Sequence, residues 1–284
     1  MAAPAPVPTP APAPHVPGVS LARVSTSEWI KLRSVRSTTI GLPLAMVVLV
    51  GVGLIMSSSM GETFAAGTEP DGAPFIPTSP AEATLNGAVF AQLLVGAIGV
   101  LYVSVEYSTG MIRATSSAVP TRLPMLWAKC LVYGGVVFGL TLLATLVAFF
   151  AGSVPLSAHG VAPSLGDPGV LRAVLATPTY LAAVGVLAIS VAVLMRSTVL
   201  AFSTIAFVMF LLDSLAPLLL PGSVADVVVP YLPSTAGRAS MSVAFMSVPN
   251  DRELLEPLTG FAVLGGYVLV ILASAAVVLR RRDV

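Results

Sequence analysis

Charged residues are scarce in this sequence. Only 10% of its 284 residues are charged and 56% are hydrophobic, whereas about a quarter of the residues in a soluble globular protein carry charge. The mean hydropathy is +0.95. These values exclude an ordinary soluble domain and indicate an integral membrane protein. The formal net charge of +1 also provides no strongly basic surface, so nucleic acid is not expected as a partner.

Cysteine, histidine and lysine are almost absent, which excludes several kinds of site. The single cysteine, Cys130, excludes an intrachain disulfide and a multi-cysteine metal site. The two histidines, His15 and His159, lie far apart, so no histidine-based metal or catalytic site is expected. The only lysines, Lys31 and Lys129, follow no glycine-rich turn, so the chain has no phosphate loop for ATP. We expect no enzymatic activity, cofactor or metal in this chain.

The N-terminal segment differs from the rest of the chain. Residues 1–20 are rich in alternating alanine and proline, which removes backbone donors and favours an extended chain. We therefore predict a disordered tail over residues 1–20 and one membrane domain over residues 21–284. The tail has no basic residue before Arg23 and does not resemble a cleavable signal peptide.

Six apolar stretches are long enough to cross about 30 Å of hydrocarbon as helices. They cover approximately residues 38–60, 83–105, 130–153, 173–195, 197–220 and 257–279. Arg196 is the only charge between the fourth and fifth stretches, and it predicts a tight turn there. The sequence thus predicts an all-α membrane protein of six transmembrane helices.

The basic and acidic residues fall on opposite sides of this six-helix arrangement. Eleven of the fourteen basic residues fall on one side, which receives Arg23, Lys31, Arg33, Arg36, Arg113, Arg122, Lys129, Arg196, Arg280, Arg281 and Arg282. Ten of the thirteen acids fall on the other side. Because cytoplasmic loops are enriched in Lys and Arg, both termini are predicted to be cytoplasmic. A count of five or seven helices would mix the signs.

Asp213 is the one good candidate for an ionisable group within the spans. A carrier driven by an ion gradient usually keeps such a group at membrane depth, where it binds and releases the ion. The other interpretation, which we favour, is an acid at a helix end near the outer surface.

Two segments on the basic side carry the more distinctive patterns. Ser25 and Glu28 fit a capping box, which predicts a helix start. Trp29, Lys31 and Arg33 follow. This helix either lies at the membrane interface or is only a basic flank that orients the first span.

The second segment, residues 106–122, is the longest loop on the basic side. It joins the acid Glu106 to Gly110, which permits a turn, and to Arg113. The loop is either a compact structure that contacts a cytoplasmic partner or a solvated connector whose charges only follow the topology.

Four motifs together resemble those of a type-2 ATP-binding-cassette (ABC) transporter permease, the membrane subunit of an ABC exporter. They are EWIKLRS before the first span, EYSTGMIRATSSAVPTR after the second, RST at residues 196–198 and YLPSTAGRAS at residues 231–240. The resemblance implies a cytoplasmic coupling helix between spans 2 and 3, and short re-entrant helices between spans 5 and 6.

The resemblance also implies the partners and the interface. The permease pairs with a second copy or a paralogous permease and binds separate ABC ATPase subunits, which bind the ATP and magnesium. Membrane lipid surrounds it, and its location is the plasma membrane. The expected ATPase interface comprises Glu106, Gly110, Arg113, Trp29, Lys31 and Arg33. Two other functions remain open, an ion-gradient-driven carrier and a membrane assembly subunit that transports nothing.

Overall fold

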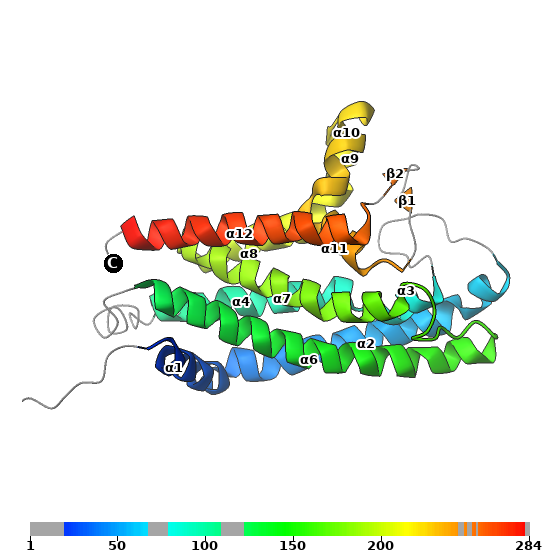
Figure 1. Ribbon diagram of the computed structural model, residues 1–284, viewed down its shortest axis with the longest axis horizontal. Coiled ribbons are helices and arrows are strands. Elements are labelled where there is room, and N and C mark those ends of the chain that lie inside the picture. The colour runs from blue at the N-terminus through cyan, green and yellow to red at the C-terminus, as the bar shows by residue number, and fades with distance from the viewer. Residues whose placement is uncertain are drawn as a thin grey trace, which may run out of the picture.

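The protein is a bundle of long helices (Figure 1). The computed structural model describes residues 20–67, 79–108, 122–243, 247–248, 252–253 and 255–281. Its elements are α1 (Leu21–Ser34), α2 (Arg36–Ala65), α3 (Pro80–Leu85), α4 (Ala88–Ser108), α6 (Arg122–Ala158), α7 (Val170–Met195), α8 (Thr198–Ala206), the π-helix η1 (Phe207–Leu211), α9 (Leu212–Leu219), α10 (Gly222–Val228), the 3-10 helix η2 (Val229–Tyr231), α11 (Pro233–Met241), β1 (Ser247–Val248), β2 (Arg252–Glu253) and α12 (Pro257–Arg281).

The six predicted spans are confirmed as helices that are long and apolar enough to cross a membrane. They cover Arg36–Ala65, Pro80–Glu106, Leu123–Ala158, Val170–Met195, Thr198–Leu219 and Pro257–Arg281. The only strands among the described residues, β1 and β2, pair antiparallel over two residues each. The all-α class follows from the need of a chain in hydrocarbon to satisfy its backbone polar groups within each helix.

The centre of the bundle lies around α4 and α7, which are the most buried of the six spans. Both helices contact the ring of Tyr133 from α6. A Cβ atom on Gly185 of α7 would lie 2.7 Å from that ring, so the glycine permits the close approach. The Tyr133 hydroxyl donates to the Val95 carbonyl of α4 at 2.6 Å. Three spans are therefore locked together around one buried tyrosine.

The predicted tight turn at Arg196 is present. Arg196 ends α7 in the left-handed region at φ 53°, which is uncommon for a residue other than glycine. Ser197 then begins the next helix, because its hydroxyl accepts a hydrogen bond from the Leu200 amide at 3.4 Å. This turn reverses the chain between the fourth and fifth spans.

The predicted helix start at Ser25 is wrong. Helix α1 begins at Leu21, with Ser20 as the N-cap whose side chain accepts from the Arg23 amide. Ser25 and Glu28 lie within α1, so they cannot form a capping box. The local sequence offers two serines with the same capping chemistry, and the helix begins at the earlier one.

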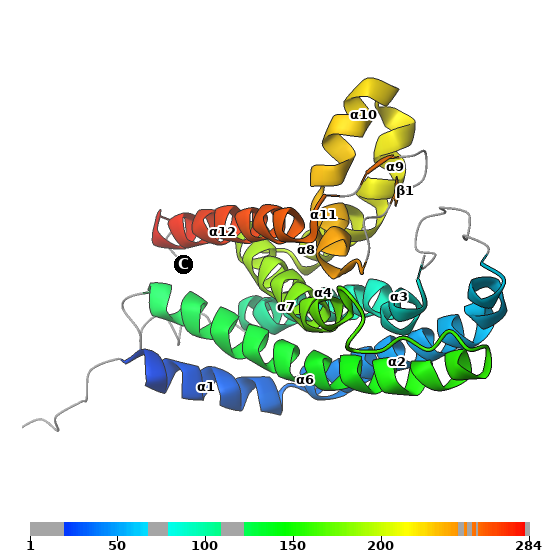
Figure 2. The ribbon, with the colours of Figure 1, turned by 45° about the vertical axis from the view of Figure 1, so that its right-hand side comes forward.

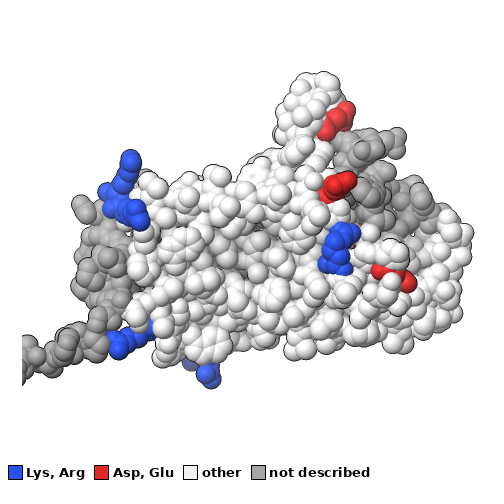
Figure 3. All heavy atoms as spheres, in the orientation of Figure 1, with Lys and Arg blue, Asp and Glu red and all other residues white. Residues whose placement is uncertain are grey.

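The two ends of the described chain lie at the same end of the bundle (Figure 1). In Figure 3, Lys and Arg gather at this end, whereas the visible Asp and Glu lie toward the opposite end, with some basic surface among them. We call these the basic end and the acidic end. The predicted tail over residues 1–20 lies, apart from Ser20, outside the described residues.

The end of the fifth span and the segment that follows it consist of short helices. Helix α9, which ends the fifth span, and α10 turn away from the bundle in both ribbon views (Figures 1 and 2). Helix α11 instead packs against α7 and α12, and eight of its nine residues are buried. Short helices thus lie between these spans, and their re-entry into the membrane stays a prediction.

Candidate functional site

A buried cluster of four charges joins three helices at the basic end. Glu28 and Lys31 lie on α1, Glu106 lies near the end of α4 and Lys129 lies near the start of α6. The Lys129 ammonium contacts Glu28 Oε2 at 2.7 Å and Glu106 Oε1 at 3.0 Å. Lys31 contacts Glu28 Oε1 at 2.7 Å and Glu106 Oε1 at 2.9 Å. We call these four residues the ion cluster. Both lysines of the chain belong to it.

Tyr102 completes the polar surroundings of Glu28. Its hydroxyl donates to Glu28 Oε2 at 2.8 Å, and the Lys129 ammonium lies 4.2 Å from the centre of its ring. The ring also stacks on Tyr133 at 5.7 Å. Tyr102 and Glu106 are one helical turn apart on α4, so both face α1. The tyrosine links the ion cluster to the centre of the bundle.

The two pairs of opposite charges stabilise one another away from water. Glu28, Lys129 and Glu106 are buried, and Lys31 is half-buried. Burial alone would raise the pKa of Glu28, but the positive charges of Lys129 and Lys31 outweigh it and hold this pKa below its usual range. Burial alone would lower the pKa of Lys31, but the carboxylates of Glu28 and Glu106 raise it. Glu28 and Lys31 therefore stay ionised near neutral pH.

The position of Glu28 follows from the periodicity of α1. Val24, Glu28 and Leu32 are buried and are spaced four residues apart, so they form the face of α1 that packs against the bundle. Lys31 follows Glu28 by one turn and reaches the same site. A carboxylate at the middle of this face has to find positive partners, because an unpaired buried charge costs several kcal/mol.

The cluster links α1 to both helices that flank residues 109–121. Glu106 is three residues before this segment and Lys129 is eight residues after it. A displacement of either helix end would break short contacts to α1 unless α1 moved with it. The ion cluster thus couples the position of α1 to the positions of the end of α4 and the start of α6.

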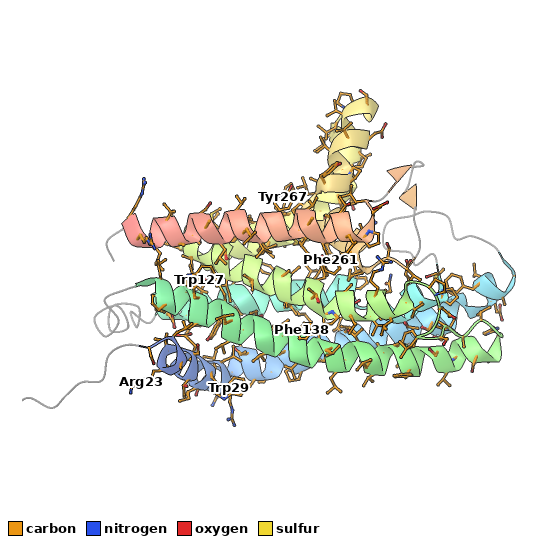
Figure 4. The ribbon with its side chains drawn as sticks, in the orientation of Figure 1. Arg23, Trp29, Trp127, Phe138, Phe261 and Tyr267 are labelled. Carbon is orange, nitrogen blue, oxygen red and sulfur yellow. The ribbon has the colours of Figure 1, made fainter. Side chains whose placement is uncertain are left out.

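The structure brings together some of the residues expected at an ATPase interface. Glu106 and Lys31 meet in the ion cluster. Trp29 and Arg33 lie on the exposed side of α1, with the guanidinium 5.8 Å from the centre of the indole, and Figure 4 shows Trp29 on the side away from the bundle. Gly110 and Arg113 lie outside the described residues.

Sequence reasoning missed the roles of Glu28, Lys129 and Tyr102. The sequence pattern places Glu28 in a capping box and counts Lys129 among the basic residues of one side, without pairing the two. The signal that points to the cluster is the presence of acids on the side that is otherwise basic. An acid on this side either weakens the charge asymmetry or is neutralised by a basic partner. In the structure the two lysines are these partners.

A second ion pair lies on the other side of the molecule. Asp213 at the start of α9 contacts Arg238 of α11, with Oδ2 3.4 Å from Nη1. The Asp213 side chain is 7% exposed and lies in the first turn of α9. This acid is therefore at a helix end, as expected, and is buried in its pair with Arg238.

No group of three or more His, Cys, Asp and Glu side chains within the described parts of the chain is placed to hold a metal ion. In comparisons by sequence, no protein-family model and no curated protein matches the chain.

Proposed function

We propose that this chain is the membrane-spanning permease subunit of an ABC exporter, in which a separate ATPase subunit supplies the energy. Six helices long enough to span a membrane and a sequence without a phosphate loop for ATP are consistent with this division of labour. The motif resemblance at four positions along the chain supports the same function.

The observation that carries the proposal is the ion cluster. An ATPase that docks on residues 109–121 would push or pull on the end of α4 and the start of α6. Lys129 and Glu106, which flank this segment, contact α1 through Glu28 and Lys31. Charge pairs are stronger in a medium of low dielectric than in water, so the three helices would move together and transmit the ATPase closure to the spans.

The assembly and its orientation follow from the same proposal. The basic end, with both ends of the described chain, faces the cytoplasm, and the chain lies in the plasma membrane. The coupling helix that the resemblance implies between spans 2 and 3 would contact the ATPase, and α11 would be a re-entrant helix. Two permease chains, identical or paralogous, bind two ATPase subunits, and lipid covers the remaining apolar surface.

Purification of the tagged chain from its native host in a mild detergent tests the proposal. We expect an ATPase with a phosphate loop to co-purify and to show vanadate-sensitive ATP hydrolysis. In Glu106→Lys a third positive charge faces Lys31 and Lys129, so ATPase recovery or hydrolysis should fall at least about tenfold. The matched control is Glu62→Lys, because Glu62 is exposed near the end of α2 at the acidic end. Recovery of wild-type chain without any ATPase would overturn the proposal.

An ion-gradient-driven carrier is the second candidate, and the burial of Asp213 favours it. The pairing with Arg238 would have to break for Asp213 to bind a proton or cation. Substrate uptake or efflux that persists after ATP depletion, and that is lost in Asp213→Asn but retained in Glu62→Gln, would establish this function. Transport that stops when ATP is depleted, and that the Asp213→Asn variant retains, would exclude the ion-gradient-driven carrier.

A further inference from the structure

The fifth span is interrupted by a π-helix at Phe207–Leu211, between α8 and α9. The Leu212 amide bonds to the Phe207 carbonyl, five residues back. The neighbouring α4 also makes a hydrogen bond to the π-helix, in which Gln92 Nε2 donates to the Met209 carbonyl at 3.4 Å. Such one-turn π-helices are a recognised cause of helix kinks and are frequent at functional sites. The span changes direction here in both ribbon views (Figures 1 and 2).

The hydrophobic core of the bundle stops at the same place. Ala201, Ile205 and Met209 of the fifth span belong to the main core. The next buried residue along this span, Ala216, belongs to a separate small cluster with Ala225 and Val229. We call residues 212–232, which comprise α9, α10 and η2, the outer arm. The arm has its own small core and protrudes from the bundle beyond the π-helix.

Helix α11, by contrast, is fixed to the bundle. The guanidinium of Arg172 on α7 donates to the Ser242 carbonyl at 2.8 Å, and Glu82 of α3 accepts from the Val243 amide at 2.9 Å. Along the length of α11, Gly237 packs closely against the ring of Tyr180 on α7. A helix held at its end and along its length is a stationary surface against which the arm can move.

The arm is joined to α11 by the chain itself, where Leu232 caps the start of α11, and by the ion pair of Asp213 and Arg238. Asp213 lies two residues after the π-helix, and the Oδ2 to Nη1 distance of 3.4 Å is at the long limit for a hydrogen bond. Asp213 Oδ1 and the hydroxyls of Ser234 and Thr235 are buried without a hydrogen-bond partner among the described residues. Buried polar atoms without partners are unfavourable, so the contact between the arm and α11 is weaker than that of a fully hydrogen-bonded interface.

We propose that the outer arm is a hinged element that swings about the π-helix at one end and about its junction with α11 at Leu232 and Pro233 at the other, and that the Asp213–Arg238 pair is the latch that holds it in the position seen here. Opening the latch frees α9 from α11, and the arm then moves relative to the bundle as one body with its small core. The swing changes the contacts that α9 and η2 make with α11. This device belongs to the fold and does not depend on the energy source of the protein.

Distance measurements between two spin labels test the hinge. The labels are placed at Val227→Cys on the arm and Leu269→Cys on α12, because both side chains are largely exposed. The buried Cys130 is replaced by alanine so that no other thiol is labelled. In lipid nanodiscs we expect one main distance with the latch intact. In Asp213→Asn, a second distance should gain population by about tenfold or more, since removing one partner of a buried charge pair strongly destabilises the paired state.

Two further variants make the result decisive. Asp213→Asn with Arg238→Gln removes both charges, so it opens the latch without leaving an unpaired charge and should show the same second distance. Glu62→Gln makes the same change of charge away from the latch and should keep the single distance. Distance distributions that are the same in all four proteins would overturn the hinge. The measurement requires neither ATP nor a partner chain, so its outcome is separate from that of the co-purification.

Discussion

Replacement of Lys129 by methionine is expected to destabilise the basic end of the bundle. Lys129 contacts both carboxylates of the ion cluster, Glu28 at 2.7 Å and Glu106 at 3.0 Å. In Lys129→Met the cluster changes from two positive and two negative charges to one positive and two negative charges. Lys31 alone then has to neutralise two buried carboxylates. Methionine keeps the length of the aliphatic stem, so the change removes mainly the charge.

The expected loss in the free energy of unfolding follows from the burial of Lys129 and its partners. Glu28 has no exposed side-chain surface and Lys129 is 2% exposed, so solvent screening is weak. Breaking a buried ion pair by removing one partner costs about 3–5 kcal/mol. Adding Glu28→Gln to Lys129→Met restores a neutral cluster of Lys31 and Glu106. The double variant should therefore regain part of the loss, with a coupling of about 1–3 kcal/mol.

The assay is the free energy of unfolding in one detergent for the wild type, both single variants and the double variant. Arg36→Met is the control, because Arg36 is a basic residue at the same end with an exposed side chain, and its effect should stay within about 0.5 kcal/mol. A loss for Lys129→Met no larger than that of the control would refute the reasoning. Strictly additive effects in the double variant would refute the coupling between Lys129 and Glu28.

Three other predictions concern pH, packing and the backbone. The lowered pKa of Glu28 means that its ionised form stabilises the fold above its ordinary pKa of 4.5 and that this contribution is lost as the pH falls through the folded value. The melting temperature should thus fall more steeply with acid in the wild type than in Glu28→Gln. Gly237→Ala should cost about 1–3 kcal/mol by thermal unfolding, because its Cβ would overlap the ring of a buried tyrosine, whereas Gly135→Ala, whose Cβ meets nothing within 4 Å, should not destabilise. Arg196→Gly should raise stability by about 1 kcal/mol, since glycine adopts the positive φ of this turn without a steric cost, and a loss of stability would contradict this.

The sequence predicted the number and extent of the spans because hydrophobicity is a local property. A stretch such as 38–60 has to form a helix in hydrocarbon whatever its neighbours are, since its backbone groups have no other partner there. The turn at Arg196 was predictable for the same reason, because the apolar run around it is too long for one span. The side of the membrane that each end faces stays a prediction from the charges.

The candidate site was only partly predictable, because its residues are far apart in the chain. Lys31 and Glu106 were expected at one interface, but nothing local to Glu28 indicates that it meets Lys129, which is 101 residues away. A serine three residues before a glutamate is also a capping signal, and this local pattern competed with the tertiary role. Glu28 belongs to the ion cluster because α1 packs beside α4 and α6.

The sequence by itself determined that this is a membrane protein with six apolar helices and predicted that most of its basic residues lie on one side. Only the tertiary structure decided that Glu28, Lys31, Glu106 and Lys129 form one cluster, and that the fifth span bends at a π-helix. Partition into lipid depends on the composition of each segment alone. Charge pairing and helix bending depend on which neighbours the packing brings within a few ångströms, and these neighbours are distant in the chain.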